Sequence, residues 1–378
     1  MKENPLSEEL IEQSESLFAD WDDNDIVQGG ISVSYRHHIL RRVVLIATCV
    51  AVCIAVSGLA ITIGEYDISF FESYRIMIDH LFGNIADDRV GVIKDHIIWD
   101  LRLPCILVAL ISGVGLAISG AAMQSTLRNP LADPYTTGIS SGAAFGATLA
   151  IIYFGGASTG NVQTVVSAFV FSLVPTAVII SLSVAKKVSP VSMIMAGIAV
   201  MYIFNAITTM IKLWADPNDL EAIYLWSVGS FDTIRWDDLP VMFFVTLFGS
   251  IGIMLISNKL NILASGDESA KSLGIDASRL RIICLVVVSL ITASIVSFTG
   301  IIGFVGLVAP HVVRLFIGSD NKFLIPASAA FGAALLLISD LVGRTIIAPS
   351  VIQVGVITSF IGGPLFLYLI IRQKKEMW

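Results

Sequence analysis

Apolar runs of about 20 residues recur along this chain, and each is long enough to cross the roughly 30 Å hydrocarbon core of a bilayer as a helix. Only helices and closed barrels cross, because every backbone N–H and C=O needs a partner away from water. The sequence lacks the alternating segments of a membrane barrel. Charged residues make up 14% of the 378 residues, against roughly 25% in a soluble protein. We therefore predict an all-α, polytopic membrane protein.

The apolar runs give ten predicted crossings. The eighth is the shortest, and Pro310 interrupts it. Long polar loops, 65–102 and 213–238, follow the first and the fifth crossing. The crossings are 43–64, 103–126, 136–155, 162–184, 190–212, 239–257, 278–298, 301–317, 323–342 and 349–372.

Lysine and arginine are distributed unevenly about these crossings. If residue 1 is cytoplasmic, the inside segments and their flanks hold 16 of the 23 Lys and Arg residues, and the outside segments hold 7. Positive residues gather on the cytoplasmic side of a membrane. The pattern therefore predicts a multi-pass protein of the cell (plasma) membrane with both termini in the cytoplasm.

The chain divides into a tail and a membrane domain. Residues 1–38 are polar and acidic, show no cleavable signal peptide, and are interpreted as a cytoplasmic tail. Residues 39–378 carry the crossings and form the transmembrane domain. The cysteines lie in or beside apolar runs and lack disulfide or zinc spacing, which predicts small buried hydrophobes and no metal site. These cysteines are Cys49, Cys53, Cys105 and Cys284.

The sequence argues against catalysis by this chain. No Gly-Lys dipeptide occurs, so a phosphate-binding P-loop is missing, as is a His-Glu-x-x-His motif. The segment Gly138–Gly142 matches G-x-S-x-G, but a nucleophile elbow lies between a strand and a helix, and here an apolar helix follows a proline-rich turn. An intramembrane enzyme using Ser140 is therefore the least favoured class. We predict no bound cofactor on this chain, and if transport is ATP-driven, ATP and Mg are bound by a separate polypeptide.

A gradient-driven secondary carrier for a small solute is the alternative function. Ion-coupled carriers commonly use an ionisable residue within the membrane. Carboxylates are nearly missing from mid-membrane positions here, Asp340 being near a boundary. An ATP-driven transporter is therefore favoured.

The inside segment 258–281 is polar but carries an amphipathic core. Ser265 or Asp267 can cap a short helix there, and Gly274 can end it in a left-handed turn. The segment has two interpretations: an ordinary amphipathic loop helix, or a docking helix for a cytoplasmic motor. Its predicted apolar face is made by Leu263, Ala270 and Leu273.

Glycines repeat every third residue between Thr299 and His311, at Gly300, Gly303 and Gly306. On one continuous helix this spacing would strip one face of side chains. Close helix–helix contact is the expected use of such a face.

Four ordered segments closely resemble the binding-protein-dependent permeases that import ferric siderophores, haem and vitamin B12. The similarity runs from residue 100 to residue 372 and leaves out the tail 1–38. The first segment contains a rigid polar turn, Asn129-Pro-Leu-Ala-Asp-Pro134. The four segments are Ser119–Ala147, Gly266–Gly274, Gly300–Arg314 and Val354–Tyr368.

This resemblance implies a bundle of the type II ABC importer kind, with ten helices per permease subunit. It implies a second permease subunit, expected to be an identical copy, two cytoplasmic ATPase subunits and an extracytoplasmic substrate-binding protein. The cargo would be an iron chelate, with a ferric siderophore favoured over haem or cobalamin, moved by alternating access. The lipid bilayer is the surrounding partner, and no nucleic acid is implied.

The resemblance also assigns residues at both faces. Arg102 and Arg344 match arginines that dock the binding protein, although Cys105 stands where a second arginine of the first motif is common. Asn129 and Leu131 match the cytoplasmic gate. A second constriction maps to Pro190 and Val191, where small hydroxyl residues are more usual. The segment that matches the ATPase-coupling helix contributes Gly266, Asp267, Glu268, Ala270, Leu273 and Gly274.

Overall fold

The computed structural model describes residues 30–64, 66, 68–84, 88–154, 161–186, 189–348 and 350–372. The predicted tail 1–38 lies outside this part of the chain up to residue 29. The chain divides into two compact units, Met1–Leu45 and Ile46–Trp378. The described residues of the first unit belong to α3 (Gly30–Thr62). The second unit holds the rest of α3 and every other described helix.

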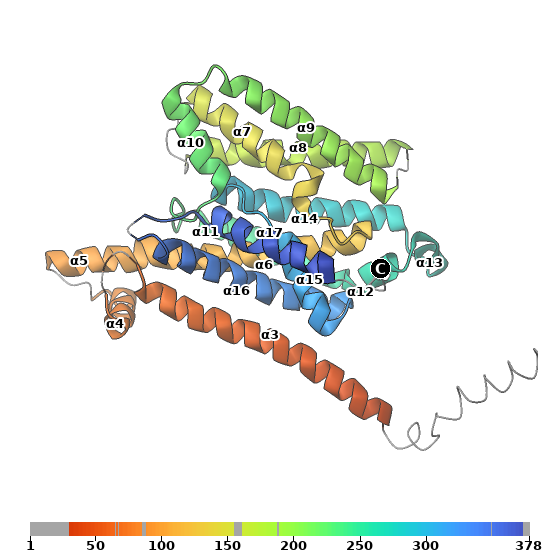
Figure 1. Cartoon of the computed structure of the whole chain (residues 1–378), viewed down its shortest axis with the longest axis horizontal. Helices are drawn as coiled ribbons and strands as arrows, with labels where there is room; N and C mark the ends of the chain where they lie inside the picture. The colour runs from red at the N-terminus through yellow and green to blue at the C-terminus, as the bar shows by residue number, and fades with distance from the viewer. Residues whose placement is uncertain are drawn as a thin grey trace, which may run out of the picture. The chain divides into compact units, whose positions relative to one another are not determined.

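The described residues form helices and turns and contain no strand (Figure 1). After α3 come α4 (Phe70–Leu81), α5 (Arg89–His96), the π-helix η1 (Ile97–Arg102), α6 (Leu103–Leu127), the 3₁₀ helix η2 (Pro134–Thr137), α7 (Ile139–Phe154), α8 (Val162–Lys186), α9 (Pro190–Lys212), α10 (Pro217–Val228), α11 (Leu239–Leu255), α12 (Ser257–Ala264), α13 (Asp267–Ser272), α14 (Ala277–Thr299), α15 (Val305–Ile317), α16 (Asn321–Thr345) and α17 (Val354–Arg372).

Each predicted crossing coincides with an apolar helix. Among the described residues, six helices are long and apolar enough to cross a membrane, and α11 with α12, bent by 55°, makes a seventh. Three shorter apolar helices, α7, α15 and the Val354–Tyr368 part of α17, account for the remaining crossings. The loop 65–102 contains regular structure: α4 lies within it, and α5 and η1 extend α6 into one 39-residue helical run, Arg89–Leu127.

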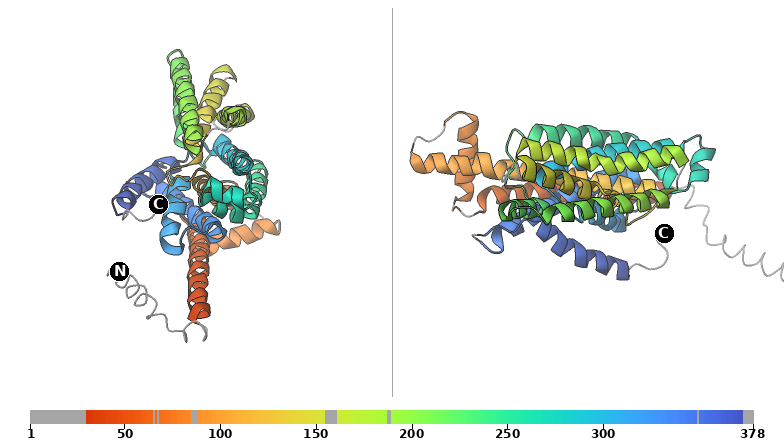
Figure 2. Two further views of the ribbon diagram at one scale, coloured as in Figure 1. Left: turned by 90° about the vertical axis from the view of Figure 1, so that its right-hand side faces the viewer. Right: turned by 90° about the horizontal axis from the view of Figure 1, so that it is seen from above.

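Helix α6 is the central helix of the second unit and packs against α11, α14, α15 and α16. Helices α7, α8 and α9 pack on one another and form a second group beside α14 (Figure 2). Two close crossings hold α6: a Cβ on Gly120 would lie 1.8 Å from the Gly306 oxygen, and one on Gly113 would lie 2.5 Å from the Gly332 oxygen. Small residues let two helix backbones approach closely, and the resulting van der Waals packing helps to drive helix association in lipid.

The glycine repeat at 300–306 does not form one helix face, because α15 begins only at Val305. Gly300 has φ +72° and would place a Cβ 2.1 Å from the Trp226 oxygen, whereas Gly306 faces α6. Gly300 therefore serves a tight backbone approach outside the helix. The prediction of close contact is confirmed, but that of a single stripped face is wrong.

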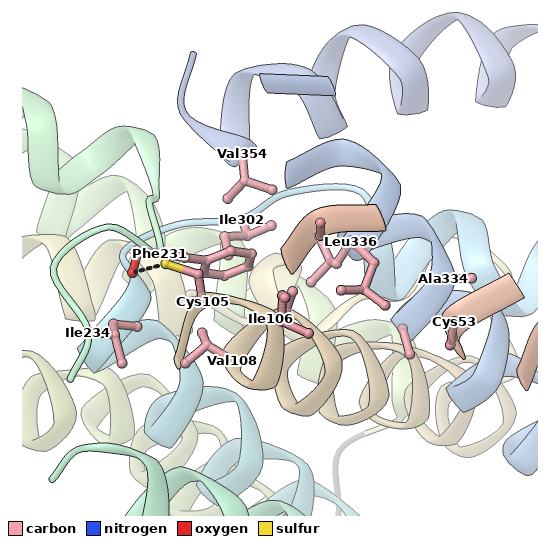
Figure 3. Close-up of a cluster of buried hydrophobic side chains, with 14 of the residues drawn as sticks. Cys53, Cys105, Ile106, Val108, Phe231, Ile234, Ile302, Ala334, Leu336 and Val354 are labelled. Atoms are coloured by element: carbon pink, nitrogen blue, oxygen red, sulfur yellow. Dashed lines mark hydrogen bonds between the residues drawn. The ribbon is translucent and has the colours of Figure 1, made fainter. Parts of the chain in front are cut away.

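The largest buried cluster joins side chains of α3, α6 and α16 to Phe231 and Ile234, which lie between α10 and α11 (Figure 3). Within it, the Cys105 thiol donates to the Phe231 oxygen at 3.4 Å. All four cysteines are free and buried. Their predicted role as small buried hydrophobes is confirmed.

Candidate functional site

The turn between α6 and α7 is held by its own side chains. Helix α6 ends at Arg128, which adopts a left-handed conformation with φ 49°. The Asn129 side chain then accepts from the Leu131 N–H at 2.9 Å, and Asp133 accepts from the Tyr135 N–H at 2.9 Å within a capping box that opens η2. These local bonds replace the helical ones that the ends of helices lose. The predicted gate residues Asn129 and Leu131 thus lie on a rigid segment, with Leu131 half exposed.

The same turn is fastened to the segment that leads into α15. The Tyr135 hydroxyl accepts from the Ile302 N–H at 3.4 Å, and a Cβ on Gly306 would lie 3.4 Å from Asp133 Oδ2. Burial raises the pKa of Asp133 to about 6, opposed by the hydrogen bond from Tyr135. Burial also raises the pKa of Tyr135. Asp133 is therefore a buried carboxyl group whose ionised form is disfavoured by its surroundings.

We expect Asp133→Asn to leave the fold at least as stable at pH 7 and to flatten its pH dependence. The folded pKa is about 6, above the roughly 3.9 of an unfolded aspartate, so the folded chain binds more protons between these values. The free energy of unfolding of the wild type therefore falls as the pH rises from about 4 to about 6. Asparagine keeps the acceptor for the Tyr135 N–H. Melting temperatures in detergent between pH 4 and 7 measure the effect, and an equal slope for both proteins contradicts it.

The second predicted constriction begins helix α9. Ser189 caps this helix by accepting from the Ser192 N–H at 3.2 Å, and Pro190 occupies its first position, where a missing N–H costs little. Val191 is largely exposed. Helix α9 packs on the end of the α6–α7 turn, since a Cβ on Gly197 would lie 2.7 Å from Thr137 Cα.

The short helix α13 occupies the segment that matches the coupling helix. It is preceded by Gly266 (φ +126°) and followed by Gly274 (φ +75°). Gly266 is its N-cap residue, so the prediction of Ser265 or Asp267 as cap is wrong. Glycine fits both ends because side chains disfavour positive φ.

The predicted apolar face of this segment is divided. Ala270 and Leu263 are fully buried and pack with Leu280 of α14. Glu268 is exposed, and Leu273 is 65% exposed. Ala270 therefore anchors α13 to the bundle, while Glu268 and Leu273 remain available to another protein.

A buried arginine that sequence reasoning missed lies beside α13. Arg281 is 5% exposed; its guanidinium donates to the Asp267 carboxylate, and its Nε donates to the Thr126 oxygen at 3.3 Å. Arg128 adds a second cation, with Nη2 3.4 Å from Asp267 Oδ1. The hydrogen bond from Arg281 lowers the pKa of Asp267, so the carboxylate stays ionised. In the sequence, Arg281 registers only as one positive charge near a helix end.

Arg102 and Arg344 lie at the opposite end of the second unit and line one cavity of about 550 Å³. Arg102 is 3% exposed and donates to the oxygens of Ile61 (2.6 Å), Thr62 (2.9 Å) and Tyr66 (3.0 Å). Arg344 pairs with Asp340 at 2.9 Å, and its Nε has no hydrogen-bond partner in the described part of the chain. Both arginines have internal roles, which their motif positions did not indicate.

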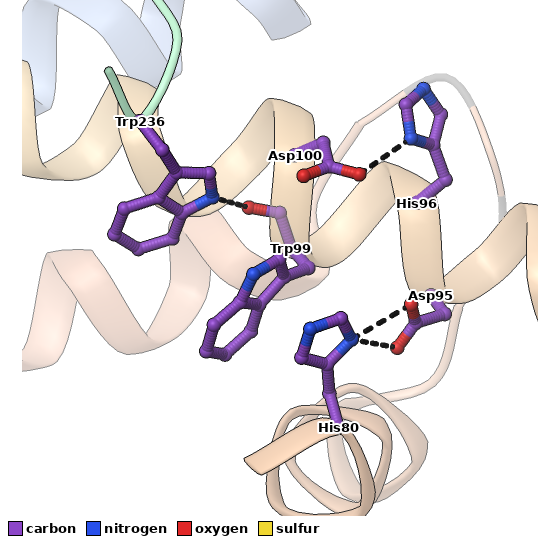
Figure 4. Close-up of polar contacts among 6 residues, drawn as sticks. All are labelled: His80, Asp95, His96, Trp99, Asp100 and Trp236. Carbon is purple, nitrogen blue, oxygen red and sulfur yellow. Dashed lines mark hydrogen bonds and ion pairs between the residues drawn. The ribbon is translucent and has the colours of Figure 1, made fainter. Parts of the chain in front are cut away.

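An aromatic and histidine cluster at the same end fastens α4 to η1 (Figure 4). His80 Nδ1 lies 2.8 Å from Asp95, and the His80 ring stacks on Trp99 with centroids 4.0 Å apart. The Trp236 Nε1–H donates to the Trp99 oxygen at 2.8 Å. This cluster stabilises the region that holds Arg102.

The helical architecture is that of a known kind of transporter. A solved structure described as an inward-facing conformation of a candidate metal-chelate type ABC transporter is similar to this chain, with a TM-score of 0.75 and 29% identity over 87% of this chain and 99% of that one. The Gly138–Gly142 segment follows a 3₁₀ helix rather than a strand, so it lacks the context of a nucleophile elbow. The chain is a multi-pass membrane permease of the ABC transporter class.

The FecCD transport family matches residues 49–372, and the chain belongs to this family. It is 43% identical to a protein of Methanocaldococcus jannaschii named as a candidate ABC transporter permease, over 84% of this chain and 91% of that one. It is 38% identical to the hemin transport system permease protein HmuU of Yersinia pestis, over 74% and 85%. Other relatives are named for cobalamin and iron(3+)-hydroxamate import. The resemblance seen in the sequence is confirmed and begins earlier in the chain.

Proposed function

We propose that this chain is the permease subunit of an ABC importer that moves an iron chelate, with a ferric siderophore as the favoured cargo, into the cytoplasm. The observation that carries the proposal is α13, a short helix anchored by buried Ala270 and exposed at Glu268 and Leu273. A separate ATPase can grip such a helix and move it as a rigid body. Relatives named for hemin and iron(3+)-hydroxamate transport support the class of cargo.

The working assembly would contain two copies of this chain, two ATPase subunits that bind ATP and Mg, and an extracytoplasmic binding protein. Both termini would lie in the cytoplasm, on the side of α13. ATP would draw the ATPases together and shift the permease between outward-open and inward-open states. It can do so only through different affinities for the two states. Asn129, Leu131, Pro190 and Val191 would form the cytoplasmic constrictions.

The binding protein would dock at the end that carries the 550 Å³ cavity. Arg344 is better placed than Arg102 to meet an acidic group, because its side chain keeps 12% of its surface exposed, whereas Arg102 is 3% exposed. The three carbonyl bonds of Arg102 leave it less free. Docking by charges of this kind weakens as salt screens them.

Reconstitution tests the proposal. The chain is placed in proteoliposomes with the ATPase and binding protein encoded beside it, and uptake of a ferric hydroxamate, haem and cobalamin is compared. We expect ATP-dependent accumulation of the ferric hydroxamate that an ATPase with a disabled P-loop abolishes and an ionophore leaves intact. Accumulation of only haem or cobalamin would change the cargo. Uptake lost with an ionophore alone would overturn the ATP-driven mechanism in favour of a secondary carrier.

A further inference from the structure

The second turn of α14 carries an arginine whose surroundings suggest more than a charge at the membrane surface. Arg281 is 5% exposed, although long cationic side chains at helix ends usually extend to water. Its two hydrogen bonds reach two other helices: one goes to Asp267 at the start of α13, and the other to Thr126 at the end of α6, 155 positions away in the sequence. The Asp267 side chain is 45% exposed, so the pair is partly buried, and a charge-assisted bond with one buried partner fixes geometry more tightly than an ion pair between two exposed side chains.

The contact at Thr126 lies just before the gate segment. The Thr126 oxygen is among the last carbonyls of α6, which helix geometry leaves without an intrahelical partner. Two residues later, Arg128 turns into the left-handed conformation, and its Nη2 lies 3.4 Å from the same Asp267 oxygen. Asn129 follows directly. One carboxylate of α13 is therefore shared by two arginines, both tied to the end of α6.

The other side of α13 is held by packing. Ala270 has no exposed surface and lies with Leu263 and Leu280 in one apolar cluster. Rotation of α13 would therefore strain both the apolar contact and the arginine contacts. Since neither side is free, a displacement of α13 has to be passed to α14 and to the end of α6.

We propose that Arg281, acting with Asp267 and Arg128, is the positioning residue that transmits movement of α13 to the gate segment Asn129–Leu131. This inference rests on the proposed function, in which α13 is gripped by the ATPase. Without the link, α13 still presents Glu268 and Leu273 to its partner, so ATP hydrolysis continues. The gate, however, no longer follows, and hydrolysis is uncoupled from uptake. A purely structural arginine would instead affect stability, hydrolysis and uptake together.

The test compares Arg281→Gln and Arg281→Lys in proteoliposomes with the ATPase and the loaded binding protein. We expect Arg281→Gln to keep complex assembly and ATP hydrolysis within about twofold, while cargo imported per ATP falls by about tenfold. Arg281→Lys should retain part of the coupling. The matched control is Arg279→Gln, which removes the same charge from an exposed side chain of the same helix that pairs with Asp276 three residues before it.

A spin label attached at Leu131→Cys in both copies of the chain gives a label–label distance, which does not change with a loss of stability alone. The four native cysteines are buried, so the label reports from residue 131. We expect ATP to change the label–label distance in the otherwise wild-type permease and not in the Arg281→Gln background, although ATP still binds.

Normal coupling in Arg281→Gln, or a parallel fall of hydrolysis, uptake and melting temperature, would overturn the inference. Absence of ATP-driven uptake in the wild type would instead overturn the proposed function.

Discussion

Gly120→Ala is expected to destabilise the fold so strongly that little folded protein is recovered. A Cβ on Gly120 would lie 1.8 Å from the Gly306 oxygen, and that oxygen belongs to the α15 backbone, which cannot rotate away as a side chain can. Helices α6 and α15 must then separate at their crossing. Overpacking usually costs about 1–3 kcal/mol, and a clash with backbone places this variant at or above the top of that range. The measurements are the yield of monodisperse protein in detergent and its melting temperature.

Two glycines of the same unit provide graded controls. At Gly115 a Cβ would meet only side-chain ends, the nearest being Ile295 Cδ1 at 2.5 Å. At Gly252 a Cβ would meet no atom within 4 Å, and alanine is favoured over glycine in a helix by up to about 1 kcal/mol. We expect Gly252→Ala to melt at or above the wild-type temperature, Gly115→Ala below it and Gly120→Ala lowest. Equal melting of the Gly120 and Gly252 variants would contradict the crossing.

The crossings could be predicted because a bilayer imposes one length and one composition on every spanning helix. The points at which the backbone departs from helical geometry within a predicted crossing could not be predicted. The predicted crossing 301–317 begins only at Val305, since Gly300 and Phe304 both adopt positive φ. Phenylalanine gives no sequence signal for that conformation. Likewise the polarity of 65–102 gives no signal for α4 and η1, which contact each other where the His80 ring stacks on Trp99.

For the candidate site, the motifs nominate residues but do not indicate which other residues these contact. The resemblance places Ala270 on the predicted coupling segment. Only the fold reveals that its side chain packs against Leu263 and Leu280 and is not exposed to a second protein. Arg281 is not predicted at all, because its partner Thr126 is 155 positions away in the sequence. Contacts over such separations depend on how helices pack, and a motif carries no record of that packing. The sequence therefore only nominates candidate residues, and the structure divides these into exposed and internal ones.

Arg102→Glu is expected to destabilise the protein before it affects docking. The wild-type guanidinium donates to the oxygens of Ile61 and Thr62, among the last carbonyls of α3, which helix geometry leaves without intrahelical partners, and to the Tyr66 oxygen. A carboxylate would bring negative charge against these acceptors in a site that is 3% exposed. An unsatisfied buried polar group costs about 1–3 kcal/mol, and several here act together, so a loss of about 3 kcal/mol or more follows. The melting temperature in detergent, measured alone and at several salt concentrations, reports this loss.

Two further variants separate stability from docking. Arg75→Glu makes the same charge reversal on a side chain that is 83% exposed and should leave the melting temperature unchanged. Arg102→Lys keeps the charge but not the planar fork of donors, so it should melt between Arg102→Glu and the wild type. Had Arg102 acted mainly through charge at a rim, Arg102→Glu would melt like the wild type and lose binding-protein affinity chiefly at low salt. That outcome would return Arg102 to the docking role its motif suggests and contradict the internal role that its three carbonyl bonds give it.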